Sequence, residues 1–89
     1  MPPLYDPLLG QIMAGDSPPG VPRAVVRRAR YLGHLIPCAR LRSTIAGIGG
    51  ELYQFPDGGH AVRINARWLL TFDWDPDLSR AHSLALDRI

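Results

Sequence analysis

The sequence predicts an α+β protein in two layers, with N-terminal helices packed on one face of a mainly antiparallel four-stranded sheet. Apolar residues in the first half of the 89-residue chain recur with the period of a helix, whereas those in the second half alternate as in a strand. The links between the alternating segments are short, which makes neighbouring strands antiparallel. A chain of this length supports one hydrophobic core, so we expect residues 1–89 to form a single domain.

The longest predicted helix runs from Pro22 to Ile36. At about 100° per residue its apolar side chains fall on one stripe, which comprises Val25, Ala29, Leu32 and Ile36. A basic ridge lies on nearly the opposite stripe and comprises Arg23, Arg27, Arg30 and His34. No acidic residue occurs between Asp16 and Glu51 to pair with this ridge. The ridge is therefore either a solvated face or a surface for an anionic partner, such as RNA or an acidic protein.

Two shorter segments of the first half also have helical character. Residues 7–14 form a short helix that begins with a proline, whose missing N–H is not needed at that position. Pro37 is expected to end the long helix. Residues 38–46 are predicted to form a second helical stretch, which the following glycines close. Residues 1–6 have only weak strand character, because the prolines within them cannot donate hydrogen bonds to a sheet.

Period-two patterns predict four strands in the second half of the chain. They cover residues 51–55, 60–65, 68–74 and 81–86, and the PDGG sequence between the first two is typical of a turn. One face of the third strand carries only large apolar side chains, namely Trp68, Leu70, Phe72 and Trp74. One face of the fourth is expected to carry His82, Leu84 and Leu86, and the other Ala81, Ser83 and Ala85. We expect the apolar faces to form a core with the helices.

The composition excludes several classes of protein. No apolar run approaches the ~20 residues that cross a bilayer, and the MPPLYDPLL start lacks the features of a signal peptide. We therefore expect a cytoplasmic protein that does not bind membranes. The single cysteine excludes an internal disulfide and a thiolate zinc site, and the three histidines are scattered, so neither a metal nor another cofactor is expected. All ten cationic side chains are arginines, which suit phosphate and carboxylate groups, and the net charge is +2.

The HAVRINARWLLTF sequence of residues 60–72 is the most specific motif in the chain. It resembles the strand–turn–strand pattern s-I-r-V-N-x-x-W-R-I-x-F of the HigB-type killer proteins of the RelE superfamily, the toxins of bacterial toxin–antitoxin pairs. Ile64-Asn65, Trp68 and Phe72 fall at matching positions. The resemblance runs from about Leu8 to the end of the chain, and includes the arginine-bearing helix and an L-x-x-[FL] strand at residues 52–55.

The resemblance implies a RelE-like fold and a ribosome-associated mRNA endoribonuclease, or mRNA interferase. Such an enzyme cleaves RNA through the 2′-hydroxyl without a metal or cofactor. The implied partners are mRNA, the ribosome and a neutralising protein antitoxin with a helix-turn-helix domain. DNA would be contacted only through that antitoxin.

The chain departs from the family at the positions that perform catalysis. Leu69 stands where the family has an arginine after the tryptophan, and Pro56-Asp57 replaces a basic residue and glycine. Tyr53 stands in place of a histidine, and the chain ends in DRI instead of a terminal pair of the Tyr-His type. No catalytic residue of the family therefore carries over by position, and whether the chain is an enzyme stays open.

RNA cleavage through a 2′-hydroxyl needs a proton acceptor, a proton donor and cations for the phosphate. The candidates for these roles, expected around a concave cationic surface, are Tyr53, His60, Arg63, Arg67 and Arg88. Four of them also have an ordinary structural interpretation: Tyr53 as a strand residue, His60 as a solvated turn residue, and Arg63 and Arg67 as partners of Asp73 or Asp87. Three functions follow: an active ribonuclease, a toxin-fold protein without nuclease activity that binds an antitoxin or the ribosome, and a transcriptional co-regulator bound to a DNA-binding antitoxin.

Overall fold

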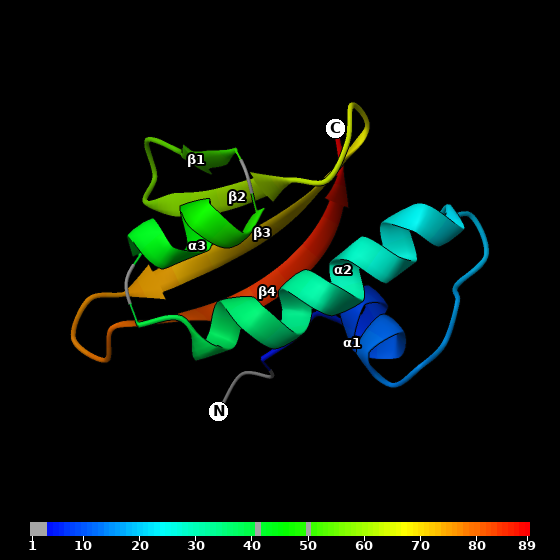
Figure 1. Ribbon diagram of the computed structural model, residues 1–89, viewed down its shortest axis with the longest axis horizontal. Coiled ribbons are helices and arrows are strands. Elements are labelled where there is room, and N and C mark those ends of the chain that lie inside the picture. Colours follow the sequence, from blue (N-terminus) through cyan, green and yellow to red (C-terminus); the bar gives the residue numbers. More distant parts are fainter. Residues whose placement is uncertain (1–3, 41, 50) are drawn as a thin grey trace.

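The computed structural model describes residues 4–40, 42–49 and 51–89 and has the expected α+β architecture (Figure 1). Its helices are α1 (Pro7–Met13), α2 (Arg23–Leu35) and α3 (Arg42–Gly49). Its strands are β1 (Leu52–Gln54), β2 (Gly59–Arg63), β3 (Trp68–Asp75) and β4 (Arg80–Arg88). The strands form one antiparallel sheet in the order β1-β2-β3-β4, as their short connections require. The helices lie on one side of this sheet.

Helix α1 begins and ends where its sequence indicates. Asp6 caps its N-terminus, because the carboxylate accepts a hydrogen bond from the backbone N–H of Leu9 at 2.8 Å, and Pro7 follows the cap. Gly15, at a φ of +106°, turns the chain away after the helix. Just before α1, Tyr5 forms a parallel bridge with Leu84 of β4. Residues 1–3 lie outside the described residues, so the structure tests only the end of the weak N-terminal strand.

Helix α2 presents its predicted apolar stripe to the core. Val25, Ala29, Leu32 and Ile36 are all essentially inaccessible to solvent. The helix passes at Leu35 into a short 3₁₀ turn over Ile36–Cys38, which accommodates Pro37. The backbone of Ala39 is then extended, so α3 begins only at Arg42 and not at residue 38 as its sequence suggested. Gly50, one of the glycines expected to close this stretch, lies outside the described residues.

The turn between β1 and β2 is confirmed. The N–H of Gly58 donates to the Phe55 carbonyl at 3.0 Å, and the Phe55 N–H donates to the Gly59 carbonyl at 2.7 Å. Gly58 has a φ of +95°, and Asp57 accepts from the Gly59 N–H at 2.9 Å. A glycine is needed at such a φ, since a Cβ would clash with the backbone.

The predicted alternation of β4 is wrong over its first half. The pairing of β3 with β4 is irregular between Thr71 and Asp73, and Ser83 takes a φ of +55°, as expected of an extra residue in a β-bulge. The bulge shifts the phase of the strand, so that Ala81 joins Leu84 in the core while His82 is exposed.

The core lies between the helices and the face of the sheet that carries Trp68, Leu70 and Phe72. Trp74 continues that face and packs against the core from its margin. Among the described residues, no helix is both long enough and apolar enough to cross a bilayer.

Candidate functional site

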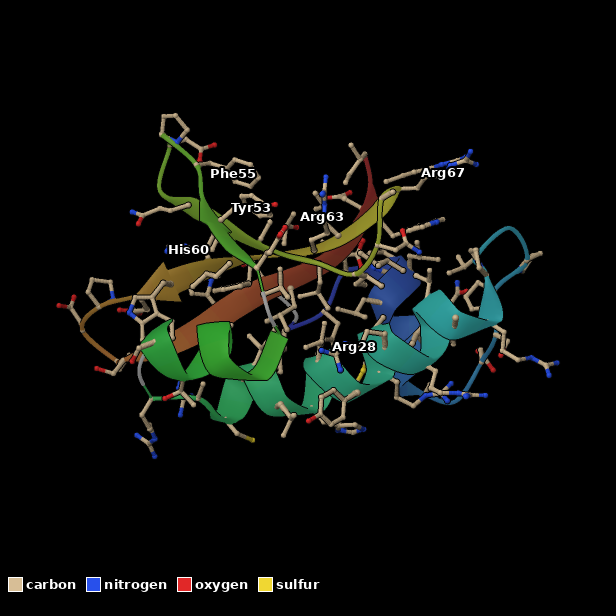
Figure 2. All side chains as sticks on the ribbon, turned by 45° about the horizontal axis from the view of Figure 1, so that its top comes forward. Arg28, Tyr53, Phe55, His60, Arg63 and Arg67 are labelled. Carbon is tan, nitrogen blue, oxygen red and sulfur yellow. The ribbon has the colours of Figure 1, made fainter. Side chains whose placement is uncertain are left out.

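The sheet has an open face that α2 and α3 do not cover. Since Val62 and Leu70 point into the core, the residues that alternate with them point the other way. Cross-strand pairing places Arg63 opposite Leu69, and Leu69 opposite Asp87. Figure 2 shows Tyr53, Phe55 and Arg63 on this open face, on the other side of the sheet from α2 and α3.

Three titratable side chains meet at the β1 end of the open face. The phenol of Tyr53 donates a hydrogen bond to the carboxylate of Glu51, two residues earlier on the same face. This hydrogen bond, partial desolvation and the negative charge of Glu51 raise the pKa of Tyr53 above its ordinary value of 10.0. The positive charge of Arg63 opposes the shift without cancelling it. The cluster therefore brings together a phenol, a carboxyl group and a guanidinium group.

Glu51→Gln is expected to lower the pKa of Tyr53, because it removes the charged acceptor and leaves Arg63 in place. Ultraviolet titration of each protein, with the corresponding Tyr53→Phe protein subtracted, isolates this phenol from the other tyrosines. The raised pKa stabilises the folded protein below the unfolded value, and this contribution is lost as pH rises through the folded pKa. Asp87→Asn, also on the open face, is the control that should leave the titration unchanged. An unaltered pKa in Glu51→Gln would contradict the cluster.

The structure does not bring the other predicted catalytic residues to this cluster. His60 alternates with Ala61, lies on the helix side of β2 with 4% exposure, and stacks on Phe72 with ring centres 5.3 Å apart. It is thus neither a solvated turn residue nor a neighbour of the Tyr53 phenol. Arg88 is also on the helix side, where its guanidinium lies 5.9 Å from the centre of the Trp68 ring.

Arg67 belongs to the link between β2 and β3. The side chain of Asn65 accepts hydrogen bonds from the backbone N–H groups of Arg67 at 2.8 Å and Trp68 at 3.0 Å, which shapes this link. In Figure 2 the Arg67 side chain extends away from Arg63 at the far end of the sheet. The expectation that these two arginines converge is therefore wrong.

The charge of the open face also differs from expectation. The carboxylates of Glu51, Asp73 and Asp87 stand on the same face as Arg63 by strand register. Asp87 accepts a hydrogen bond from the Thr71 hydroxyl at 3.3 Å, and no ion pair with Arg63 is formed in the described part of the chain. The open face therefore carries more carboxylates than guanidinium groups and is not the predicted cationic surface.

The outer face of α2 carries the concentrated positive charge. Arg23 and Arg27 are exposed as predicted, and so is His34. Arg30 instead turns toward α1, where its Nε donates to the Ile12 carbonyl at 3.0 Å and its terminal nitrogen to the Asp16 carbonyl at 3.4 Å. Arg30 thus stabilises the end of α1 and the loop that follows it, and it contributes less positive charge to the outer face of α2.

Sequence reasoning missed two members of this surface. Arg28 stacks on Tyr31, with its guanidinium carbon 5.1 Å from the ring centre, and Tyr31 is 50% exposed. Together with Ala24 and Arg27 they line a shallow hollow of about 380 Å³. The sequence contains the pattern that places these residues together, since positions 24, 27, 28 and 31 share one stripe of a helix. We call the surface formed by Arg23, Arg27, Arg28 and Tyr31 the arginine face.

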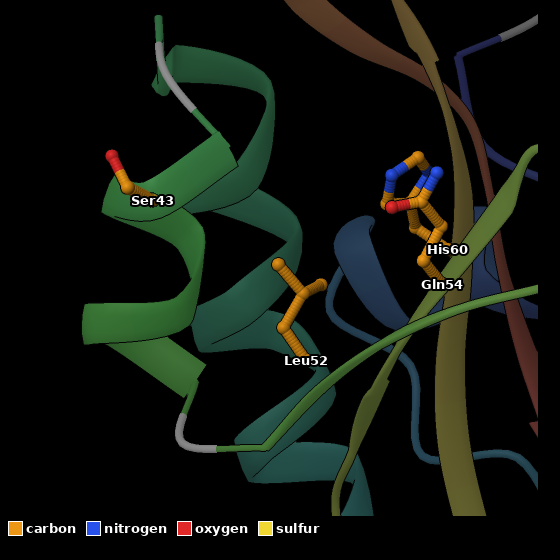
Figure 3. Close-up of a pocket in the computed structure, with 4 residues that line it drawn as sticks. All are labelled: Ser43, Leu52, Gln54 and His60. Carbon is orange, nitrogen blue, oxygen red and sulfur yellow. The ribbon is translucent and has the colours of Figure 1, made fainter.

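A second hollow, of about 310 Å³, lies between α3 and the sheet. Figure 3 shows the imidazole of His60 beside the amide of Gln54 on the strand side, with Leu52 between them and α3. Ser43 lines the helix side, but its hydroxyl points away from His60 in this view. The arrangement does not place His60 within reach of the Glu51–Tyr53 pair across the sheet.

No family model, curated protein or solved structure matches the chain. Within the described residues, no group of three His, Cys, Asp or Glu side chains is arranged to hold a metal ion.

Proposed function

We propose that this chain is a toxin-fold protein of RelE-like type that binds RNA through the arginine face and has no efficient ribonuclease activity. The observation that carries the proposal is the exposed arginines of α2, in a stretch of chain with no acidic residue between positions 16 and 51. A surface of arginines without interspersed acids attracts the phosphate backbone. The resemblance of the chain to proteins that act on mRNA at the ribosome favours RNA over an acidic protein.

The separation of the predicted catalytic residues supports the non-enzymatic part of the proposal. His60 and Arg88 lie on the helix side of the sheet, and Arg67 extends away from Arg63. Arg63 stands among several carboxylates, and this is a poor site for a phosphate that gains negative charge in the transition state. Loss of a single such stabilising group costs about 10²–10³ in rate in well-studied enzymes.

A second candidate function is the endoribonuclease that the resemblance implies. The cluster of Tyr53, Glu51 and Arg63 favours it, because it holds a proton donor, a proton acceptor and a cation on one exposed face. In this reading Glu51 takes the proton of the 2′-hydroxyl, Tyr53 protonates the leaving 5′-oxygen and Arg63 binds the phosphate. The 2′-oxygen would displace that 5′-oxygen and leave a 2′,3′-cyclic phosphate.

A protein antitoxin is the proposed partner of the chain under either candidate function. Co-purification with the product of an adjacent small reading frame is expected if the chain belongs to such a pair. DNA contact would then run through the antitoxin, as the resemblance implies.

Incubation of the purified chain with end-labelled single-stranded RNA distinguishes the candidates. We expect a salt-sensitive rise in fluorescence anisotropy and RNA of unchanged length on a denaturing gel. Shortened RNA with a 2′,3′-cyclic phosphate, lost in Tyr53→Phe, would overturn the proposal in favour of the ribonuclease. Absence of binding at low salt would refute RNA recognition altogether.

A further inference from the structure

The hollow on the arginine face has the shape and chemistry of a site for a flat, anionic ligand. Ala24 gives it a floor, since a methyl group leaves room above the helix between the longer side chains around it. Arg27 stands one turn further along the helix, and Tyr31 and Arg28 complete the lining. Half of the Tyr31 surface stays exposed although Arg28 lies against the ring. An aromatic face and guanidinium groups thus border one hollow.

We infer that this hollow holds one unpaired nucleotide of a single-stranded RNA, with its base stacked on Tyr31 and its phosphate at Arg27. The inference rests on the proposed function and specifies the form of RNA that the arginine face accepts. Aromatic rings and guanidinium planes are the groups on which proteins stack unpaired bases. In a duplex both faces of a base are covered by its neighbours, so a duplex reaches the arginines but not the ring.

Arg28 acts here as a positioning residue for Tyr31. Its guanidinium lies against the ring at 5.1 Å, a distance typical of a cation–π contact. This contact restricts the ring, so less side-chain freedom is lost when a base stacks on it. The contact therefore orients the exposed ring of Tyr31 beside the hollow for stacking with a base.

The test compares one RNA in two forms. The probe is a mixed-sequence RNA of about 12 nucleotides, within the footprint of single-strand binding proteins, used alone and annealed to its complement. Tyr31→Ala is expected to weaken binding of the single strand by about tenfold, as for the loss of one stacked base, and to leave duplex binding unchanged. Tyr31→Phe should bind as the unaltered protein does. Phe55→Ala, which removes an exposed aromatic ring from the open face, is the matched control and should bind both forms normally.

The outcomes separate this inference from the proposed function. Binding of neither form by the unaltered protein would refute the proposed function. Binding of both forms with unchanged affinities in Tyr31→Ala would overturn the nucleotide site alone. Preference for polyglutamate over RNA would refute both, because the arginine face would then bind an acidic protein. A loss confined to the single strand in Tyr31→Ala supports the site.

Discussion

Phe72→Ala is expected to lower the free energy of unfolding by about 3–5 kcal/mol, which is the usual cost of deleting a buried phenylalanine ring. Phe72 is 2% exposed in the middle of β3, and His60 stacks on its ring. Domains of this size have a total stability of about 5–15 kcal/mol, so the loss removes a large part of it. The expected fall in melting temperature is at least about 12 °C. Urea unfolding followed by tryptophan fluorescence measures the change.

Phe55→Ala is the control for this prediction. Phe55 is the other phenylalanine of the chain, and its ring is 40% exposed on the open face beside Gly59. Its loss should cost less than about 1 kcal/mol, as at other exposed positions. Equal losses in the two variants would mean that the assignment of the two sheet faces is wrong.

The simultaneous substitution of Arg23, Arg27 and Arg28 by glutamine is expected to weaken RNA binding by about 100-fold at low salt. The phosphate contacts of Arg23 and Arg27 contribute on the order of 1 kcal/mol each, and the loss of Arg28, which holds the Tyr31 ring, costs about as much. The slope of the logarithm of affinity against the logarithm of salt should fall by about 1.4, since each of the two phosphate contacts with a single strand contributes about 0.7. Anisotropy titrations over a range of salt concentrations measure both quantities.

Two single substitutions serve as controls for the triple variant. Arg30→Gln removes the hydrogen bonds to the carbonyls of Ile12 and Asp16, so it should cost about 1 kcal/mol of stability and leave RNA affinity nearly unchanged. Arg63→Gln alters the open face and should bind RNA normally. If Arg63→Gln instead abolishes binding while the triple variant binds well, RNA occupies the open face.

The helices, the strands and the turn between the first two strands could be predicted from local sequence patterns. The buried stripe of α2, the first proline of α1, the PDGG turn and the apolar face of β3 all follow from the spacing of a few neighbouring residues. The fold class followed from these elements and from the short links between strands. The start of α3 was misplaced because the extended backbone at Ala39 interrupts a stretch whose composition suits a helix throughout.

Which residues belong to the candidate sites was harder to predict from the sequence. The spacing of α2 predicts the basic ridge but also places Arg30 in it, because helical spacing does not reveal that α1 offers carbonyl groups beside Arg30. Helical spacing places Arg28 and Tyr31 beside Ala24 and Arg27, but only the structure shows the guanidinium of Arg28 against the Tyr31 ring. Glu51 was missed because its role depends on the Tyr53 phenol bending back toward it.

Periodicity along the chain was enough to establish the helices, the strands and the apolar faces, because burial of a repeating stripe depends on residues a few positions apart. Packing established which side of the sheet each polar residue reaches and which charges share a surface. The bulge at Ser83 changes the phase of β4, and the helices cover His60 while leaving Tyr53 exposed. Such outcomes depend on strand register and on contacts between segments far apart in sequence, which no local pattern encodes.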